Sequence, residues 1–99
     1  MEQTNYVVMV AGIVEPGKDD YAKQYFQHMA DEAKSDPGCL VYNIQQSLSN
    51  SCEFMMYSIW ENKEAFEMHN QKPEMQEYKQ SLNKLLLEDQ SRITEWALL

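Results

Sequence analysis

The sequence of 99 residues has little glycine, proline, cysteine and positive charge. Three glycines and no Gly-rich loop exclude the backbone cradle with which nucleotide-binding proteins hold phosphate. Eight Lys and Arg side chains against 16 Asp and Glu give a net charge of −8, which repels nucleic acid and anionic membrane surfaces. Since no apolar run approaches the roughly 18 to 20 residues of a membrane span, we expect neither nucleic acid nor a membrane as a partner.

The cysteines and the first residues indicate the compartment. Cys39 and Cys52 are too few for a disulfide framework, and their spacing is not that of a metal-binding pair. We therefore expect two reduced, mostly buried thiols and no metal. The stretch Met1–Tyr6 is polar and lacks the basic head of a signal peptide, which predicts a cytoplasmic protein.

The length indicates one domain, over residues 1–99. A domain of this size buries only about 60 to 65% of the surface that its unfolded chain exposes, so its stability is marginal unless a partner covers more. We therefore expect the chain to associate with a second copy.

Hydrophobic periodicity divides the chain into strands and helices. Alternating or β-branched apolar runs predict strands, whereas apolar residues at steps of three and four predict amphipathic helices. The second helix pauses at Gln71-Lys72 and restarts at Pro73, a residue common in the first turn of a helix. The predicted order is strand, helix, strand, strand, broken helix and strand, at Asn5–Val14, Asp19–Ser35, Cys39–Ser47, Cys52–Trp60, from Glu61 onward and Ser91–Leu98.

This β-α-β-β-α-β order is that of an α+β, ferredoxin-like domain with an antiparallel sheet. Such a sheet carries both helices on one face, yet strands Asn5–Val14 and Cys52–Trp60 are apolar on both faces. The face without helices is then a large apolar patch, which marks an interface. The sequence therefore predicts a homodimer packed sheet to sheet, with a space between sheet and helices for a small apolar ligand.

Two stretches carry motifs of a known family. Asp36–Tyr42 (DPGCLVY) resembles the PGC-L-x-Y opening of the second strand in antibiotic biosynthesis monooxygenase (ABM) domains. Ile59–His69 (IWENKEAFEMH), followed by Lys72–Tyr78 (KPEMQEY), resembles that family's W-x-x-x-x-A-x-x-x-H signature, which precedes a proline and an aromatic residue. The resemblance extends from Tyr6 to Trp96.

The resemblance implies a dimeric α+β barrel and, as in characterised members, oxidation of polycyclic phenols or quinols by O2 without metal, flavin or other cofactor. The expected function is therefore cofactor-independent monooxygenation of a small aromatic or quinol-type substrate. Some relatives isomerise small metabolites, and a non-catalytic dimeric barrel that binds a metabolite stays open, because fold membership does not fix the reaction. Relatives that degrade haem use asparagine, tryptophan and histidine where this chain has Val10, His69 and Lys79, so haem degradation is a minor alternative.

His69 is the predicted catalytic base. It matches the helix histidine of the resemblance and lies just before the predicted helix break, where its side chain can point toward the sheet. A neutral imidazole can accept a proton from a phenol or quinol hydroxyl near pH 7, and cofactor-free oxygenation needs that electron-rich anion before O2 reacts. The structural alternative is a helix-end histidine hydrogen-bonded to the backbone.

Four further residues are predicted to bind the substrate. Trp60, the strand-end aromatic of the resemblance, could stack on a flat ring or donate its N–H, although core packing would also explain it. Tyr6 shares a strand face with small residues that leave room for a ligand, and Asn43 is the polar residue of the second strand that we select. Tyr78 adds a further phenol hydroxyl from the broken helix.

Overall fold

The computed structural model describes residues 5–87 and 91–99, so residues 1–4, part of the polar N-terminal stretch, lie outside the described residues. The predicted order of elements is confirmed, including the break in the second helix, and the bounds differ from the predicted ones by at most two residues. The elements are β1 (Tyr6–Ile13), α1 (Asp19–Ala33), β2 (Cys39–Gln46), β3 (Glu53–Trp60), α2 (Lys63–Gln71), α3 (Pro73–Leu85) and β4 (Arg92–Ala97).

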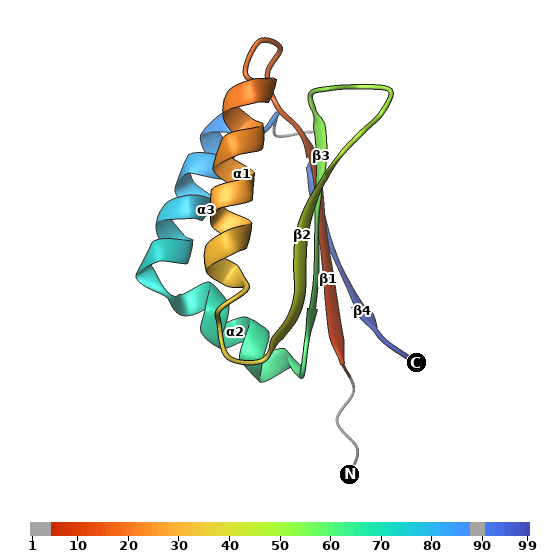
Figure 1. The fold of residues 1–99 in the computed structure, drawn as a ribbon, viewed down its shortest axis with the longest axis vertical. Coiled ribbons are helices and arrows are strands. Elements are labelled where there is room, and N and C mark those ends of the chain that lie inside the picture. Colours follow the sequence, from red (N-terminus) through yellow and green to blue (C-terminus); the bar gives the residue numbers. More distant parts are fainter. Residues whose placement is uncertain (1–4, 88–90) are drawn as a thin grey trace.

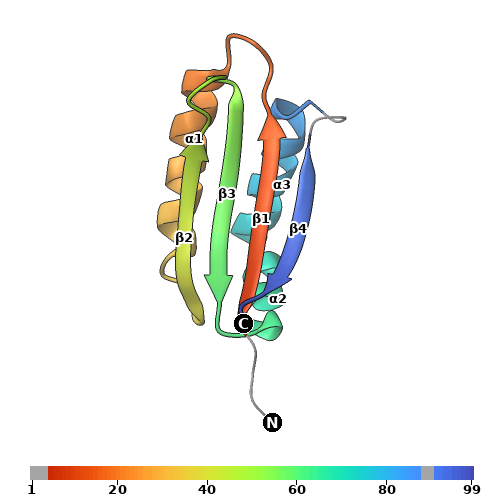
Figure 2. The same cartoon turned by 90° about the vertical axis from the view of Figure 1, so that its right-hand side faces the viewer.

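The strands form one antiparallel sheet in the order β2-β3-β1-β4. The helices all cover the same face of this sheet, as the side view in Figure 1 shows. The opposite face is open along β2, β3, β1 and β4 (Figure 2). The fold is therefore the predicted ferredoxin-like α+β arrangement of two layers.

Strand alternation decides which side chains the helices bury. On β1, Val8 belongs to the core between sheet and helices, whereas Met9 lies on the outer face and is only half-buried. On β3 the core side chains are Phe54, Met56 and Trp60. On these two strands the outer face is apolar as well, as predicted, and carries half-buried Met9, Ala11, Ile13, Met55, Tyr57 and Ile59.

The helices are amphipathic and short. Helix α1 has 15 residues and buries Phe26 and Met29 against the sheet, while α3 has 13 and buries Leu82 and Leu85. Lys72 is extended, with φ −63° and ψ 137°, and Pro73 opens α3, which explains the break because proline disfavours helical geometry in the residue before it. No helix in the described ranges is long and apolar enough to cross a membrane.

Two glycines with positive φ form the turns at either end of α1. Gly17 follows β1 with φ +89°, and Gly38 precedes β2 with φ +81°. A Cβ on Gly38 would lie 2.5 Å from the Cβ of Ala65 in α2, whereas a Cβ on Gly17 would meet no atom within 4 Å. Gly38 therefore permits both the turn and the close approach of α2.

Alanine substitution at the two turns should separate these effects. Both Gly17→Ala and Gly38→Ala incur the left-handed penalty of about 1 to 2 kcal/mol. Gly38→Ala should lower the free energy of unfolding by a further ~1 to 3 kcal/mol, because the new methyl group collides with Ala65. Urea denaturation of the two variants measures the difference, and equal losses would contradict the close packing of α2 on this turn.

Candidate functional site

A cavity of about 480 Å³ lies between the sheet and the helices. Its sheet wall is mostly apolar, and its helix wall mixes apolar residues with polar side chains near the ends of α2 and α3. The volume is within the range of small-molecule sites. The described residues that line it are Val8, Val10, Met29, Tyr42, Met56, Ser58, Phe66, His69, Asn70, Lys79, Leu82, Asn83, Leu86, Ser91, Arg92 and Ile93.

His69 is a buried titratable group in the wall of this cavity. It stands in the last turn of α2 and is only 5% exposed, because its ring points toward β2 and β3. The ring centroid is 4.6 Å from that of Trp60 and 5.8 Å from that of Tyr42. The predicted placement of this histidine, from the helix toward the sheet, is therefore confirmed.

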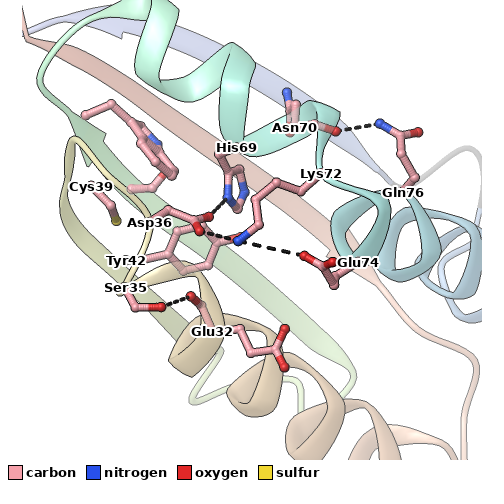
Figure 3. A network of polar contacts seen from close by, with 12 residues as sticks. Glu32, Ser35, Asp36, Cys39, Tyr42, His69, Asn70, Lys72, Glu74 and Gln76 are labelled. Atoms are coloured by element: carbon pink, nitrogen blue, oxygen red, sulfur yellow. Dashed lines mark hydrogen bonds and ion pairs between the residues drawn. The ribbon is translucent and has the colours of Figure 1, made fainter.

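A buried carboxylate holds the imidazole (Figure 3). Nδ1 of His69 is 2.6 Å from Oδ2 of Asp36, which lies in the turn between α1 and β2. The other oxygen of Asp36 accepts a hydrogen bond from Nζ of Lys72, the extended residue between α2 and α3. Asp36 is buried, whereas Lys72 is partly exposed and also reaches Glu74, with Nζ 3.8 Å from Oε2.

These contacts fix the charges of the pair. Burial raises the pKa of Asp36, but the hydrogen bonds and charges of His69 and Lys72 outweigh burial and bring the pKa below its usual value. Burial is also the main influence on His69 and lowers its pKa, which the hydrogen bond and charge of Asp36 offset only in part. At neutral pH, therefore, Asp36 is an anion and His69 is neutral.

The tautomer of His69 follows from its partner. An ionised carboxylate can only accept a hydrogen bond, so the proton of the neutral ring is on Nδ1. Nε2 then carries the lone pair, and no hydrogen bond joins it to a residue in the described ranges. This arrangement equips Nε2 to take a proton from a ligand in the cavity, with Asp36 stabilising the imidazolium that forms.

Tyr42 and Ser58 bring hydroxyl groups to the sheet wall. The Tyr42 hydroxyl donates to a weak acceptor, the Met56 sulfur at 3.9 Å, and burial raises its pKa, so it remains protonated. The Ser58 hydroxyl accepts from Nε1 of Trp60 at 3.0 Å and lies 3.4 Å from the carbonyl oxygen of Val8. Tyr42 is therefore the hydroxyl that can turn toward a ligand oxygen, since Ser58 is occupied.

Of the five predicted site residues, the structure places only His69 in the cavity wall. Trp60 is 0% exposed and packs behind His69. Tyr6 lies beside Phe66, with ring centroids 5.5 Å apart, and its buried hydroxyl has no hydrogen-bond partner among the described residues. Tyr78 is 9% exposed and packs between α1 and α3, where its ring is 5.3 Å from that of Tyr25.

Asn43 lies on the outer face of the sheet and is exposed, where it accepts a hydrogen bond from Gln45. Its neighbour Tyr42 lines the cavity instead. The prediction that Asn43 is the substrate-binding residue of β2 is therefore corrected to Tyr42. The strand has a register shift between Cys39 and Val41, and such an irregularity hides the alternation from simple counting.

Sequence reasoning gave no site role to Asp36 or Lys79, and among the tyrosines it preferred Tyr6 to Tyr42, the one that lines the cavity. Asp36 opens the DPGCLVY motif, and the presence of an acidic residue in one family motif and a histidine in the other is a usable signal. No sequence pattern indicates that two residues 33 positions apart form a hydrogen bond. In the described ranges, no group of three or more His, Cys, Asp or Glu residues is placed to hold a metal ion.

Solved structures of other proteins share this fold. A Pseudomonas aeruginosa protein is 19% identical, with a TM-score of 0.87 over 100% of this chain and 98% of its own. A candidate antibiotic biosynthesis monooxygenase from Nitrosomonas europaea is 16% identical, with a TM-score of 0.90 over 100% and 94%. At these identities the likeness establishes the fold alone.

Comparison of the sequence with other proteins identifies the family. An uncharacterised protein of Synechocystis sp. is 27% identical over 73 residues, which are 72% of this chain, and the chain spans about half the length of that curated relative. The profile of the antibiotic biosynthesis monooxygenase family matches residues 5–81. Since this match covers most of the sequence, including Asp36 and His69, the chain belongs to the antibiotic biosynthesis monooxygenase family.

Proposed function

We propose that the protein is a cofactor-independent monooxygenase that oxidises a small aromatic or quinol-type substrate with O2. The observation that carries the proposal is His69 in the wall of a largely apolar cavity, with its Nδ1 held by the buried carboxylate of Asp36. One atom of O2 enters the substrate and the other leaves as water, with the electrons coming from the substrate. For a quinol, the product is a hydroxyquinone.

In this proposal His69 is the catalytic base. Nε2 takes the proton of the substrate hydroxyl, and the resulting electron-rich anion reacts with O2. Asp36 stabilises the imidazolium, and Lys72 favours the anionic form of Asp36. The apolar wall excludes bulk water, which strengthens each of these electrostatic interactions.

The residues around the base have distinct roles in the proposal. Trp60 orients the imidazole by packing on it, rather than stacking on the substrate. Tyr42 takes the hydrogen-bonding role first given to Asn43, because its hydroxyl is on the cavity side. Tyr6 and Tyr78 support the helices that form the wall, through Phe66 and Tyr25 respectively.

The same base would also serve an isomerase, because moving a proton along a substrate needs no O2. Incubation with hydroquinones and anthrones under ¹⁸O2 separates the possibilities. The proposed monooxygenase incorporates one labelled atom per product and is inactive without O2. An isomerase turns over anaerobically, and a non-catalytic binding protein yields no product under either atmosphere.

We also propose that the protein is a cytoplasmic homodimer that packs through the outer face of the sheet. That face carries apolar side chains on β1 and β3 and has no helix over it (Figure 2). Trp96 on β4 extends it and is 55% exposed in the single chain. Apolar patches of this extent mark interfaces.

Removing the base should lower the rate without unfolding the protein. His69→Ala should reduce turnover by roughly 10²- to 10⁴-fold, the usual contribution of a positioned proton acceptor. His69→Gln should not restore it, because an amide cannot take a proton at neutral pH. Asp36→Asn should also lower turnover, because an amide can donate to Nδ1 and so favour the inactive tautomer. Steady-state O2 uptake measures all three variants.

A surface histidine provides the control for these variants. His28 on α1 is exposed and pairs with Glu32, so His28→Ala should retain full turnover. Circular dichroism checks that each variant is folded. Full activity of folded His69→Ala would eliminate this residue as the base.

The pH dependence of kcat/KM should show the ionisation of His69. Because burial brings its pKa below the ordinary value of 6.5, the acid limb should have its midpoint below pH 6.5. Acidification protonates Nε2 and removes the acceptor, so the rate falls as pH falls. Initial rates across pH 4.5 to 8 with a neutral substrate test this, and a midpoint above pH 6.5 would contradict it.

A charge on the outer face should disrupt the dimer. Ile59→Glu places a carboxylate on the half-buried outer face of β3, so it should produce monomers or unfolded chains at micromolar concentration. Gln24→Glu on the exposed surface of α1 adds the same charge and should leave the dimer intact. Sedimentation velocity measures both, and a stable wild-type monomer at this concentration would refute the dimer.

A further inference from the structure

The charge in the cavity wall is opposite to the charge of the chain. Acidic side chains outnumber basic ones by 16 to 8, yet no acidic residue is among the described residues that line the cavity. The lining contains two basic residues, Lys79 and Arg92. Because random placement would favour acidic residues, this reversal points to a ligand with negative charge.

Lys79 is the basic side chain that the fold directs to the cavity. It stands on α3 one turn before Asn83 and lines the cavity together with Asn83. Arg92 pairs with Ala11, an outer-face position of β1, so strand alternation assigns its guanidinium to the outer face. Glu95 pairs with Val8 and belongs to the helix side of β4, but it is not part of the cavity wall.

Among the described residues, no neighbour neutralises the positive charge of Lys79 with an ion pair. In residues 5–87 and 91–99 it forms no ion pair, whereas Lys18, Lys34 and Lys72 each pair with a carboxylate. The helix positions three and four residues away carry Met75, Gln76, Leu82 and Asn83, none of them acidic. Its side chain is exposed, and its charge adds a small part to the lowering of the His69 pKa, which is caused mainly by burial.

We propose that the substrate carries a carboxylate, which Lys79 binds at the α3 rim of the cavity while the substrate hydroxyl reaches Nε2 of His69. The aromatic body lies between these two groups, against the apolar residues of the sheet wall. This inference rests on the proposed function for the role of His69, and it narrows the substrate to aromatic hydroxy acids. Asn83 is the amide placed to donate a second hydrogen bond to the carboxylate.

The test compares the binding of two probes that differ only in the carboxylate, 6-hydroxy-2-naphthoate and 2-naphthol. Wild-type protein should bind the hydroxynaphthoate roughly 5- to 20-fold more tightly, as expected for one charge-assisted hydrogen bond at a partly exposed site. Lys79→Met should remove this preference and leave the dissociation constant of 2-naphthol unchanged. Fluorescence titration at low salt measures all the constants, and added salt should reduce the preference.

Lys84→Met is the matched control, because Lys84 is exposed on the same helix and is not part of the cavity wall. It should bind both probes as wild type does. The proposal is overturned if wild type binds both probes equally or neither, if Lys79→Met weakens both equally, or if Lys84→Met also removes the preference. Binding requires no turnover, so the two proposals fail separately. If the protein prefers the hydroxynaphthoate but takes up no O2, only the proposed monooxygenase activity is refuted. If it takes up O2 but binds both probes equally, only the proposed substrate carboxylate is refuted.

Discussion

The buried carboxylate of Asp36 is the interaction on which the site depends. An ion removed from water without partners is destabilised by several kcal/mol, and here His69 and Lys72 supply the hydrogen bonds that offset this penalty. The three residues come from the turn after α1, the end of α2 and the residue before α3. One carboxylate therefore joins the break in the second helix to the turn before β2. The helix break and this turn must both be formed before the imidazole is aligned.

The sequence predicted the fold well because each element carries its own signal. Alternation in β1, the step of three and four residues in α1, and Pro73 at the start of α3 all act within a few residues. The position of His69 followed from the same local signals. The partner of His69 did not follow from local signals, because Asp36 is distant in the chain. The choice of Asn43 failed for another reason: the register shift in β2 puts Tyr42, rather than Asn43, on the cavity side.

The residues that maintain the fold differ from those that determine the chemistry of the cavity. Solved structures with 14% to 20% identity keep the fold, so the sheet and helices tolerate almost complete replacement of the sequence. Around the cavity, the described residues bring together the His69–Asp36 pair, the Tyr42 hydroxyl and the Lys79 ammonium group, which forms no ion pair with any of them, and this combination decides which ligands can bind. A function for any member of such a fold has to be argued from these side chains.

The neutral state of His69 also connects the site to the stability of the protein. Its pKa in the folded protein is below 6.5, so on acidification the unfolded chain takes up this proton first, and the free energy of unfolding falls as pH drops below about 6.5. Asp36 has a folded pKa below 3.8, so its own contribution is retained above that value and lost only in stronger acid. Acid therefore weakens the fold in two separate stages, and the first stage protonates the same nitrogen on which the proposed chemistry depends.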